Sequence, residues 1–268
     1  MIYRCLEIQS HRGQERGPTQ GLILISSWHI IKIRCIVVVM TRSVFWEDPY
    51  LSHLNTKVKK VDGEQIILED TIAYAESGGQ ESDLASLNGV PVLQSVLDSS
   101  KKWITYFLPE DHGFKEGDSV SLEIDWRRRY RLMRHHFACE LVLVLMNRYF
   151  LDQKIELKPE NIDQSIKKVG AHMSEDKARV DFLLGENLNK YLEIIHPQFQ
   201  EIIDSNLTIE TGYFDESKRK RYWRVDGLAT VPCGGTHVKR TGEIGSVTLK
   251  RKRANKGVER VYIYLDSP

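Results

Sequence analysis

The sequence predicts an α+β fold in two modules, a β-rich one followed by one that mixes helices and strands. Short strand-like stretches separated by turn residues run from Thr56 to Asp125. The segment from Arg127 to Leu151 then contains no Gly or Pro and reads as one long helix. Beyond it, helical and strand patterns both occur, and such a mixture with antiparallel strands is typical of the α+β class.

The β-rich module is predicted from hydrophobic periodicity. Val58 and Val61, the Asp62-Gly63 pair and the run 66–68 indicate a hairpin. Further strands are expected at 90–97 and 103–108, and the alternation over 119–124 indicates a half-buried strand. A polar stretch with two glycines, 76–80, lies between them. Several short strands of this kind predict a small barrel or meander.

The second module is predicted to begin with the long helix, which carries apolar residues at three- and four-residue spacings. A second helix is expected to start near Pro159, a favoured first-turn residue. The segment 185–205 has helical composition, but Pro197 should bend or divide it. Strands are expected at 179–184, 207–213, 246–250 and 258–265.

The composition is that of a globular protein. Of 268 residues, 41% are hydrophobic and 28% charged, which excludes disordered and collagen-like chains. The net charge of +1 gives no global signal for nucleic acid. Local basic clusters can still bind phosphates, although each can equally be a solvated face. These clusters are 127–134, 218–221 and 250–253 with Lys256 and Arg260.

The N-terminal segment 1–39 is expected to be an extension outside the working fold. Its apolar stretch 22–39 resembles a membrane span, but Lys32 and Arg34 would be costly within a bilayer. Met40-Thr41 resembles a second start. We therefore expect three parts: the extension 1–39, a β-rich module 40–126 and an α+β module 127–268, with no membrane span.

The cysteines indicate a reducing compartment. Their spacing shows no disulfide framework, and a chain of this length does not need one. We therefore expect a cytoplasmic protein. The cysteines are Cys5, Cys35, Cys139 and Cys233.

The sharpest chemical feature is the sequence Cys233-Gly234-Gly235-Thr236-His237. A thiolate and an imidazole four residues apart can reach one soft divalent cation, and the glycines allow a tight turn. Alone, this spacing is weak evidence for a metal site.

Two pairs on the long helix could complete such a site. His136 and Glu140 share one face, while His135 and Cys139 share another about 100° away. Spacing alone does not choose between the pairs. Both histidines could equally be polar helix residues, with Glu140 at the surface and Cys139 in the core.

Four ordered motifs resemble the editing domain of alanyl-tRNA synthetase and its freestanding AlaX-type relatives. The resemblance runs through most of 40–268 and implies the second-additional-domain fold of the threonyl- and alanyl-tRNA synthetases. The four motifs are the 233–237 stretch continued to Gly245, the glycine-rich stretch 77–83, the helix segment 133–138 and the strand Arg179-Val180-Asp181-Phe182.

The resemblance implies a zinc ion held by His136, Glu140, Cys233 and His237. Glu140 departs from the family pattern, which has His at this position. A carboxylate is an acceptable zinc ligand, but its charge would reduce the Lewis acidity of the metal.

The resemblance also assigns residues to the substrate. Gly78 and Gly79 would position the aminoacyl end through their backbone, and Gln80 would contact it. His135 is a candidate proton carrier. The matched strand adds Arg179 and Asp181 as substrate-binding candidates.

Phe137 is a second departure, because the family usually has a small hydroxyl residue there that is implicated in recognising serine. Either Phe137 faces the core and another polar group serves, or serine specificity is altered.

The implied activity is zinc-dependent hydrolysis of mischarged Ser-tRNA(Ala), with Gly-tRNA(Ala) as a further candidate substrate. The implied partner is the tRNA(Ala) acceptor end carrying a wrong amino acid, with the basic clusters on its phosphates. Two alternatives are a tRNA-binding module that kept the zinc fold but lost turnover, and an unrelated zinc hydrolase.

Overall fold

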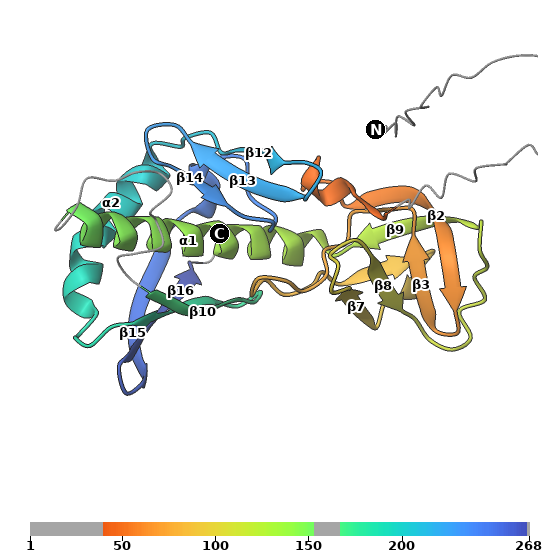
Figure 1. Cartoon of the computed structure of the whole chain (residues 1–268), viewed down its shortest axis with the longest axis horizontal. Helices are drawn as coiled ribbons and strands as arrows, with labels where there is room; N and C mark the ends of the chain where they lie inside the picture. Colours follow the sequence, from red (N-terminus) through yellow and green to blue (C-terminus); the bar gives the residue numbers. More distant parts are fainter. Residues whose placement is uncertain (1–39, 153–166, 267–268) are drawn as a thin grey trace, which may run out of the picture. The chain divides into compact units, whose positions relative to one another are not determined.

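The structure is a computed structural model that describes residues 40–152 and 167–266. The chain from Val39 to Pro268 forms one compact unit. Helices and antiparallel strands are mixed, and the first sheet curls into half a barrel, so the predicted α+β class is confirmed (Figure 1). In the described ranges no helix is long and apolar enough to cross a membrane. The extension 1–39 and the helix expected near Pro159 lie outside these ranges.

Seven antiparallel strands in the order β6-β5-β9-β2-β3-β8-β7 form the sheet of the first half of the chain. Buried and exposed residues alternate along β9, as its sequence predicts. The strands are β2 (His53–Asp62), β3 (Gln65–Leu68), β5 (Ala85–Leu87), β6 (Val90–Pro91), β7 (Gln94–Leu97), β8 (Ile104–Phe107) and β9 (Ser119–Ile124). The short strands β1 (Arg42–Ser43) and β4 (Asp70–Thr71) pair in parallel, and the 3-10 turn η1 (Val44–Trp46) directly follows β1.

The predicted hairpin is confirmed: β2 and β3 are joined at Gly63, whose φ of 59° suits glycine. The prediction of a single strand at 90–97 is wrong. This segment divides into β6 and β7, which pair with different partners at opposite edges of the sheet. Pro91 explains the edge position of β6, because proline has no backbone N–H to donate.

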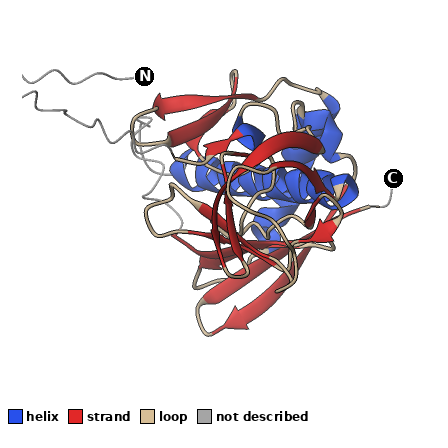
Figure 2. Ribbon diagram, turned by 90° about the vertical axis from the view of Figure 1, so that its right-hand side faces the viewer, coloured by secondary structure: helices blue, strands red, loops and turns tan. Residues whose placement is uncertain are grey.

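The second half is built around the helix α1 (Trp126–Asp152), which confirms the predicted long helix. Strands lie on both sides of it (Figures 1 and 2). One side has the sheet β10-β11-β16-β15, and the other has β12-β13-β14. These strands are β10 (Lys167–Met173), β11 (Ala178–Leu183), β12 (Glu210–Asp215), β13 (Lys220–Val225), β14 (Ala229–Pro232), β15 (Val247–Asn255) and β16 (Val258–Leu265).

The helix α2 (Asn189–Asp204) continues through Pro197 without division. Proline removes one hydrogen bond to the preceding turn, but Pro197 lies on the exposed side of the helix, where water can satisfy the freed carbonyl. The opposite side buries Tyr191, Ile195 and Phe199, and this apolar side holds the helix in place. The turn η3 (Thr241–Ile244) packs against both α1 and α2.

Buried apolar side chains form two clusters, one from residues 44–124 and one from residues 133–265. A buried ion pair lies between them: the Arg129 guanidinium in the first turns of α1 binds the Asp83 carboxylate, and neither side chain is exposed. Arg129 also donates to the carbonyls of Pro49 and Ile72. The module boundary at 126/127 stays a prediction.

Candidate functional site

Three segments far apart in the sequence meet at the middle of α1. His136 comes from the helix, Cys233 and His237 from the turn that follows β14, and Gln80 from the glycine-rich turn 77–80. One ligand atom from each of His136, Cys233 and His237 lies within 4.8 Å of the others. The structure therefore brings the two halves of the sequence-predicted metal site together.

Glu140 lies one helical turn from His136, at the edge of this cluster. Its carboxylate is 3.5 Å from His136 Nε2 and 3.7 Å from Cys233 Sγ. The indole N–H of Trp223 donates to it at 3.4 Å. Glu140 thus contacts two members of the cluster but does not belong to the group of mutually close ligand atoms.

Burial and neighbouring charges set the protonation of the cluster. Burial lowers the pKa of His237 well below its usual value, and the charges of His136 and Arg221 lower it further, so this imidazole is neutral. Burial alone would raise the pKa of Glu140. The hydrogen bond and charge of His136, with the charge of Lys168, lower it instead, so Glu140 is a carboxylate. Both groups are in the form that binds a cation.

The donor set fits a divalent cation that accepts nitrogen and sulfur ligands. His237 Nε2 is buried and has no hydrogen-bond partner within 40–152 and 167–266. A buried polar atom without a partner is destabilising unless something else binds it. The cluster can therefore hold a metal ion.

Gly235 allows the turn to approach α1. A Cβ at this position would lie 2.2 Å from His136 Cε1 and 2.9 Å from Gln80 Oε1, whereas a Cβ at Gly234 would meet nothing within 4 Å. Of the two glycines in the Cys233–His237 turn, only Gly235 thus packs too closely against its neighbours to carry a side chain.

The glycine-rich turn is held against β10. Gly78 and Gly79 have φ angles of 63° and 91°, and a Cβ on Gly79 would lie 2.4 Å from the Ala171 carbonyl oxygen. The Met173 N–H donates to the Gly79 carbonyl at 2.7 Å. Of this turn, Ser77 and Gly78 line the neighbouring cavity, while Gly79 and Gln80 do not.

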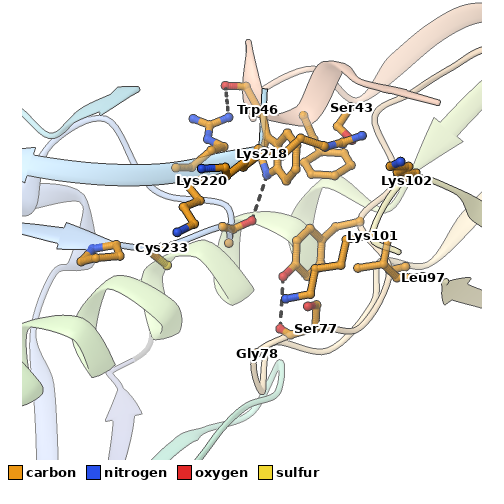
Figure 3. Close-up of a pocket in the computed structure, with 18 of the residues that line it drawn as sticks. Ser43, Trp46, Ser77, Gly78, Leu97, Lys101, Lys102, Lys218, Lys220 and Cys233 are labelled. Atoms are coloured by element: carbon orange, nitrogen blue, oxygen red, sulfur yellow. Dashed lines mark hydrogen bonds between the residues drawn. The ribbon is translucent and has the colours of Figure 1, made fainter. Parts of the chain in front are cut away.

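Beside the metal-capable cluster lies a cavity of about 960 Å³, with Cys233 in its wall (Figure 3). His136 and Glu140 also line this cavity. Its lining is strongly basic, with Glu140 as the one acidic residue among the described residues that line it. The cations come from the segment between β7 and β8, from β10, and from the β12–β13 hairpin. They are Lys101, Lys102, Lys168, Lys218, Arg219, Lys220 and Arg221.

Comparisons with known proteins agree with this arrangement. Residues 217–262 match the threonyl and alanyl tRNA synthetase second additional domain. The chain is 34% identical over 231 residues to the alanyl-tRNA editing protein AlaX-M of Pyrococcus horikoshii, covering 86% of this chain and all of the relative. The AlaX-M protein of Methanosarcina barkeri is 28% identical, with 84% and 99% covered.

The chain belongs to the AlaX-M family of alanyl-tRNA editing proteins. An alanine–tRNA ligase of Methanococcus maripaludis is also similar, at 27% identity over 82% of this chain. The chain spans about a quarter of that ligase, 25% of its length.

Several residues expected to contact the substrate or to take part in catalysis do not line the cavity. Phe137 is fully buried, with its ring against Trp223 at 4.9 Å and His237 at 6.1 Å, which favours the interpretation that it faces the core. His135 is also fully buried and does not line the cavity. Burial, with the charges of neighbouring arginines, lowers the pKa of His135 to about 3, which makes it a poor proton carrier near neutral pH.

Arg179 and Asp181 on β11 form an ion pair, and Arg260 on β16 binds the same carboxylate through two nitrogens. None of the three lines the cavity. Their positions in the sheet account for the Arg-x-Asp spacing, because alternate residues of a strand point to the same side.

Trp46 is a site residue that the sequence did not reveal. Its indole N–H donates to the Gly234 carbonyl at 2.9 Å, and the Arg221 guanidinium donates to the Trp46 carbonyl at 2.9 Å (Figure 3). Trp46 thereby fixes the start of the metal-capable turn. A single tryptophan far from every motif carries no signal in one sequence.

Proposed function

We propose that the chain hydrolyses the ester bond of mischarged alanine tRNA, releasing serine from Ser-tRNA(Ala), with Gly-tRNA(Ala) as a further substrate. One observation supports this above all: His136 and Cys233 of the metal-capable cluster lie in the wall of a cavity that seven cationic side chains of the described residues also line. An aminoacylated RNA end has both matching features, an ester carbonyl and a row of phosphates.

The resident cation in this proposal is zinc, held by His136, Cys233 and His237, with Glu140 as the fourth ligand. Nitrogen, sulfur and carboxylate oxygen are the ligands that zinc accepts in tetrahedral sites. A bound zinc ion would supply Lewis acidity toward the ester carbonyl.

The chain's own residues would orient the substrate. Cations from separate segments, among them Lys101, Lys102, Lys218 and Lys220, would bind the terminal phosphates, and the backbone at Gly78 would face the aminoacyl group. Correction of mischarging is physically reasonable, because a pocket sized for alanine cannot strongly reject glycine or a slightly larger hydroxylated analogue. We place the reaction in the cytoplasm.

The decisive experiment measures amino acid release from three substrates by the zinc-loaded protein. We expect rapid release of serine from Ser-tRNA(Ala), slower release of glycine from Gly-tRNA(Ala), and little release from Ala-tRNA(Ala). Cys233→Ala and treatment with a chelator should each abolish release, and added zinc should restore it only in the chelated wild type. Equal hydrolysis of Ala-tRNA(Ala), or full activity in Cys233→Ala, would contradict the proposal.

A second function, tRNA binding without turnover, is favoured by Glu140. Its carboxylate contacts His136 and Cys233, where the resembling family has a neutral His, and the added charge would weaken a bound metal as a Lewis acid. In that case the wild type binds tRNA(Ala) but releases no serine, and Glu140→His gains hydrolysis. A loss of activity in Glu140→His would instead favour the proposal that the wild-type protein is an active enzyme that uses Glu140.

A further inference from the structure

The side-chain amide of Gln80 contacts both halves of the metal-capable cluster. Its Oε1 lies 2.7 Å from His136 Nδ1 and 3.2 Å from the backbone nitrogen of Thr236. Its Nε2 lies 2.8 Å from Thr236 Oγ1. Gln80 is fully buried and does not line the cavity, so a role in contacting substrate does not fit its position.

These contacts fix which way the amide and the imidazole face. The Thr236 backbone N–H can only donate, so the amide atom beside it is the oxygen. That oxygen accepts from His136, and His136 Nδ1 therefore carries a proton. A bound metal would take the place of the proton on Nε2, so in the metal-binding form of His136 the lone pair is on Nε2, which lies 3.2 Å from Cys233 Sγ, inside the cluster.

Gln80 is itself held rigidly. The residues on either side of it are bound to the β10 strand, through the Gly79 carbonyl and the Glu81 N–H, which both pair with Met173. Three residues further on, the Asp83 carboxylate forms the buried ion pair with Arg129 of α1. The amide therefore cannot shift without breaking buried contacts.

We infer that Gln80 is a positioning residue: its amide holds His136 in the tautomer and ring orientation that present Nε2 to the metal, and ties the Cys233–His237 turn to α1. This inference rests on the proposed metal site. The acceptor beside a ligand histidine fixes its ring and raises its basicity, and loss of such a partner typically lowers metal affinity by about 10- to 100-fold.

The test measures metal binding without RNA. Cobalt, added to the metal-free full chain, reports the site through its visible spectrum, and competition with a chelator gives its affinity. Gln80→Met removes both polar atoms at similar volume, Gln80→Glu keeps an acceptor for His136, and Thr236→Val removes only the hydroxyl partner. Gln94→Met, on the exposed side of β7, is the matched control.

We expect Gln80→Met to weaken cobalt binding about 10- to 100-fold and to change the spectrum, because His136 loses its fixed orientation. Gln80→Glu should restore most of the affinity, Thr236→Val should show a smaller loss, and Gln94→Met should match the wild type. If Gln80→Met does not fold, the other two variants still test the inference. We then expect Gln80→Glu to bind cobalt more tightly than Thr236→Val does, and both to bind it more weakly than the wild type does.

If Gln80→Met keeps the cobalt affinity and spectrum of the wild type but loses serine release, the inference is overturned. Gln80 would then act as a substrate contact. The proposed function can fail separately. The inference that Gln80 is a positioning residue stands if cobalt binding falls as expected in Gln80→Met, even when the wild type releases no serine from Ser-tRNA(Ala). If the wild type binds no cobalt, the metal site and the inference both fall.

Discussion

Phe137 directly follows His136 of the metal-capable cluster, but its side chain does not line the cavity. It is fully buried in the core and lies against Trp223 and His237. The next position after His136 on a helix points about 100° away from it, and here that direction is into the apolar core rather than into the cavity. Serine recognition, if the chain performs it, must then use another group.

Phe137→Ala should therefore lower the stability rather than change substrate choice. Removing a fully buried phenylalanine costs about 3–5 kcal/mol. Urea unfolding measures this loss, and the ratio of serine to alanine release measures specificity. Phe214→Ala is the control, because Phe214 lines the cavity and is 55% exposed, so we expect a much smaller loss. A stable Phe137→Ala protein with altered specificity would place the ring in the substrate pocket.

Asp181 is a second residue whose role is decided by its neighbours. Burial alone would raise the pKa of this carboxyl, but the hydrogen bond from Arg260 and the charge of Arg179 lower it below its usual value. The unfolded chain thus binds a proton at a higher pH than the folded chain does. The ion pairs therefore stabilise the fold above the ordinary carboxyl pKa of about 4, and this stability is lost as the pH falls below it.

Asp181→Asn should lower the free energy of unfolding by about 1–3 kcal/mol at pH 7, since charged hydrogen bonds are lost. The difference from the wild type should narrow as the pH falls below about 4. Urea unfolding across this range measures both effects. Asp226→Asn, at an exposed turn position, should stay within about 0.5 kcal/mol of the wild type. Unchanged stability with impaired tRNA affinity would instead make Asp181 a substrate contact.

At the scale of elements, the turn from Cys233 to His237 is shaped by its neighbours as much as by its own sequence. Trp46 binds its second residue, Gln80 binds its fourth, and His136 packs on Gly235. The two adjacent glycines look equivalent in the sequence, but only Gly235 faces α1. The metal-capable geometry therefore depends on glycine at position 235, because a side chain there would collide with His136.

Gly235→Ala and Gly234→Ala form a matched pair that tests this dependence. The added methyl at Gly235 would collide with the His136 ring, so we expect cobalt affinity to fall by about tenfold or more, as for other disturbed ligand orientations. Gly234→Ala meets open space and should bind cobalt nearly as the wild type does. Equal affinities in the two variants would show that the turn can move away from α1 without harm.

At the scale of the whole molecule, the placement of the charges indicates phosphate binding, whereas the net charge does not. The chain carries only +1 overall, yet seven cations and one carboxylate from the described residues line the cavity beside the metal-capable cluster. The cations come from both halves of the chain, from Lys101 and Lys102 on one side and from the β12–β13 hairpin on the other (Figure 3). Such a concentration of positive charge attracts phosphates locally even though the net charge of the chain is small.

Lys101→Gln combined with Lys220→Gln should weaken tRNA(Ala) binding. Each lost phosphate contact should also reduce the slope of log affinity against log salt by about 0.7–0.9. Filter binding over a range of salt concentrations measures both. Lys115→Gln, an exposed lysine outside the cavity, should leave affinity and slope unchanged. If all three lysines contribute equally, RNA does not enter through this cavity.

Much of the fold could be predicted from the sequence, because local patterns record local structure. The long helix, the β2–β3 hairpin and the strands β9 and β16 follow from periodicity and turn residues. The strands β10, β13 and β14 were not predicted. The β10 and β13 sequences begin with charged residues and β14 is only four residues long, so their hydrophobic patterns are weak, and pairing with neighbours makes them strands.

The candidate site divides in the same way. The sequence offered two candidate pairs on the long helix, and the resemblance to the editing family selected His136 with Glu140 to join Cys233 and His237. The packing of the folded chain shows that Gln80 contacts His136 and the Cys233–His237 turn and that Phe137 and Asp181 do not line the cavity. The direction of a side chain depends on which segments pack against it, and at this site Gln80 and Thr236 are joined across 156 positions of the chain.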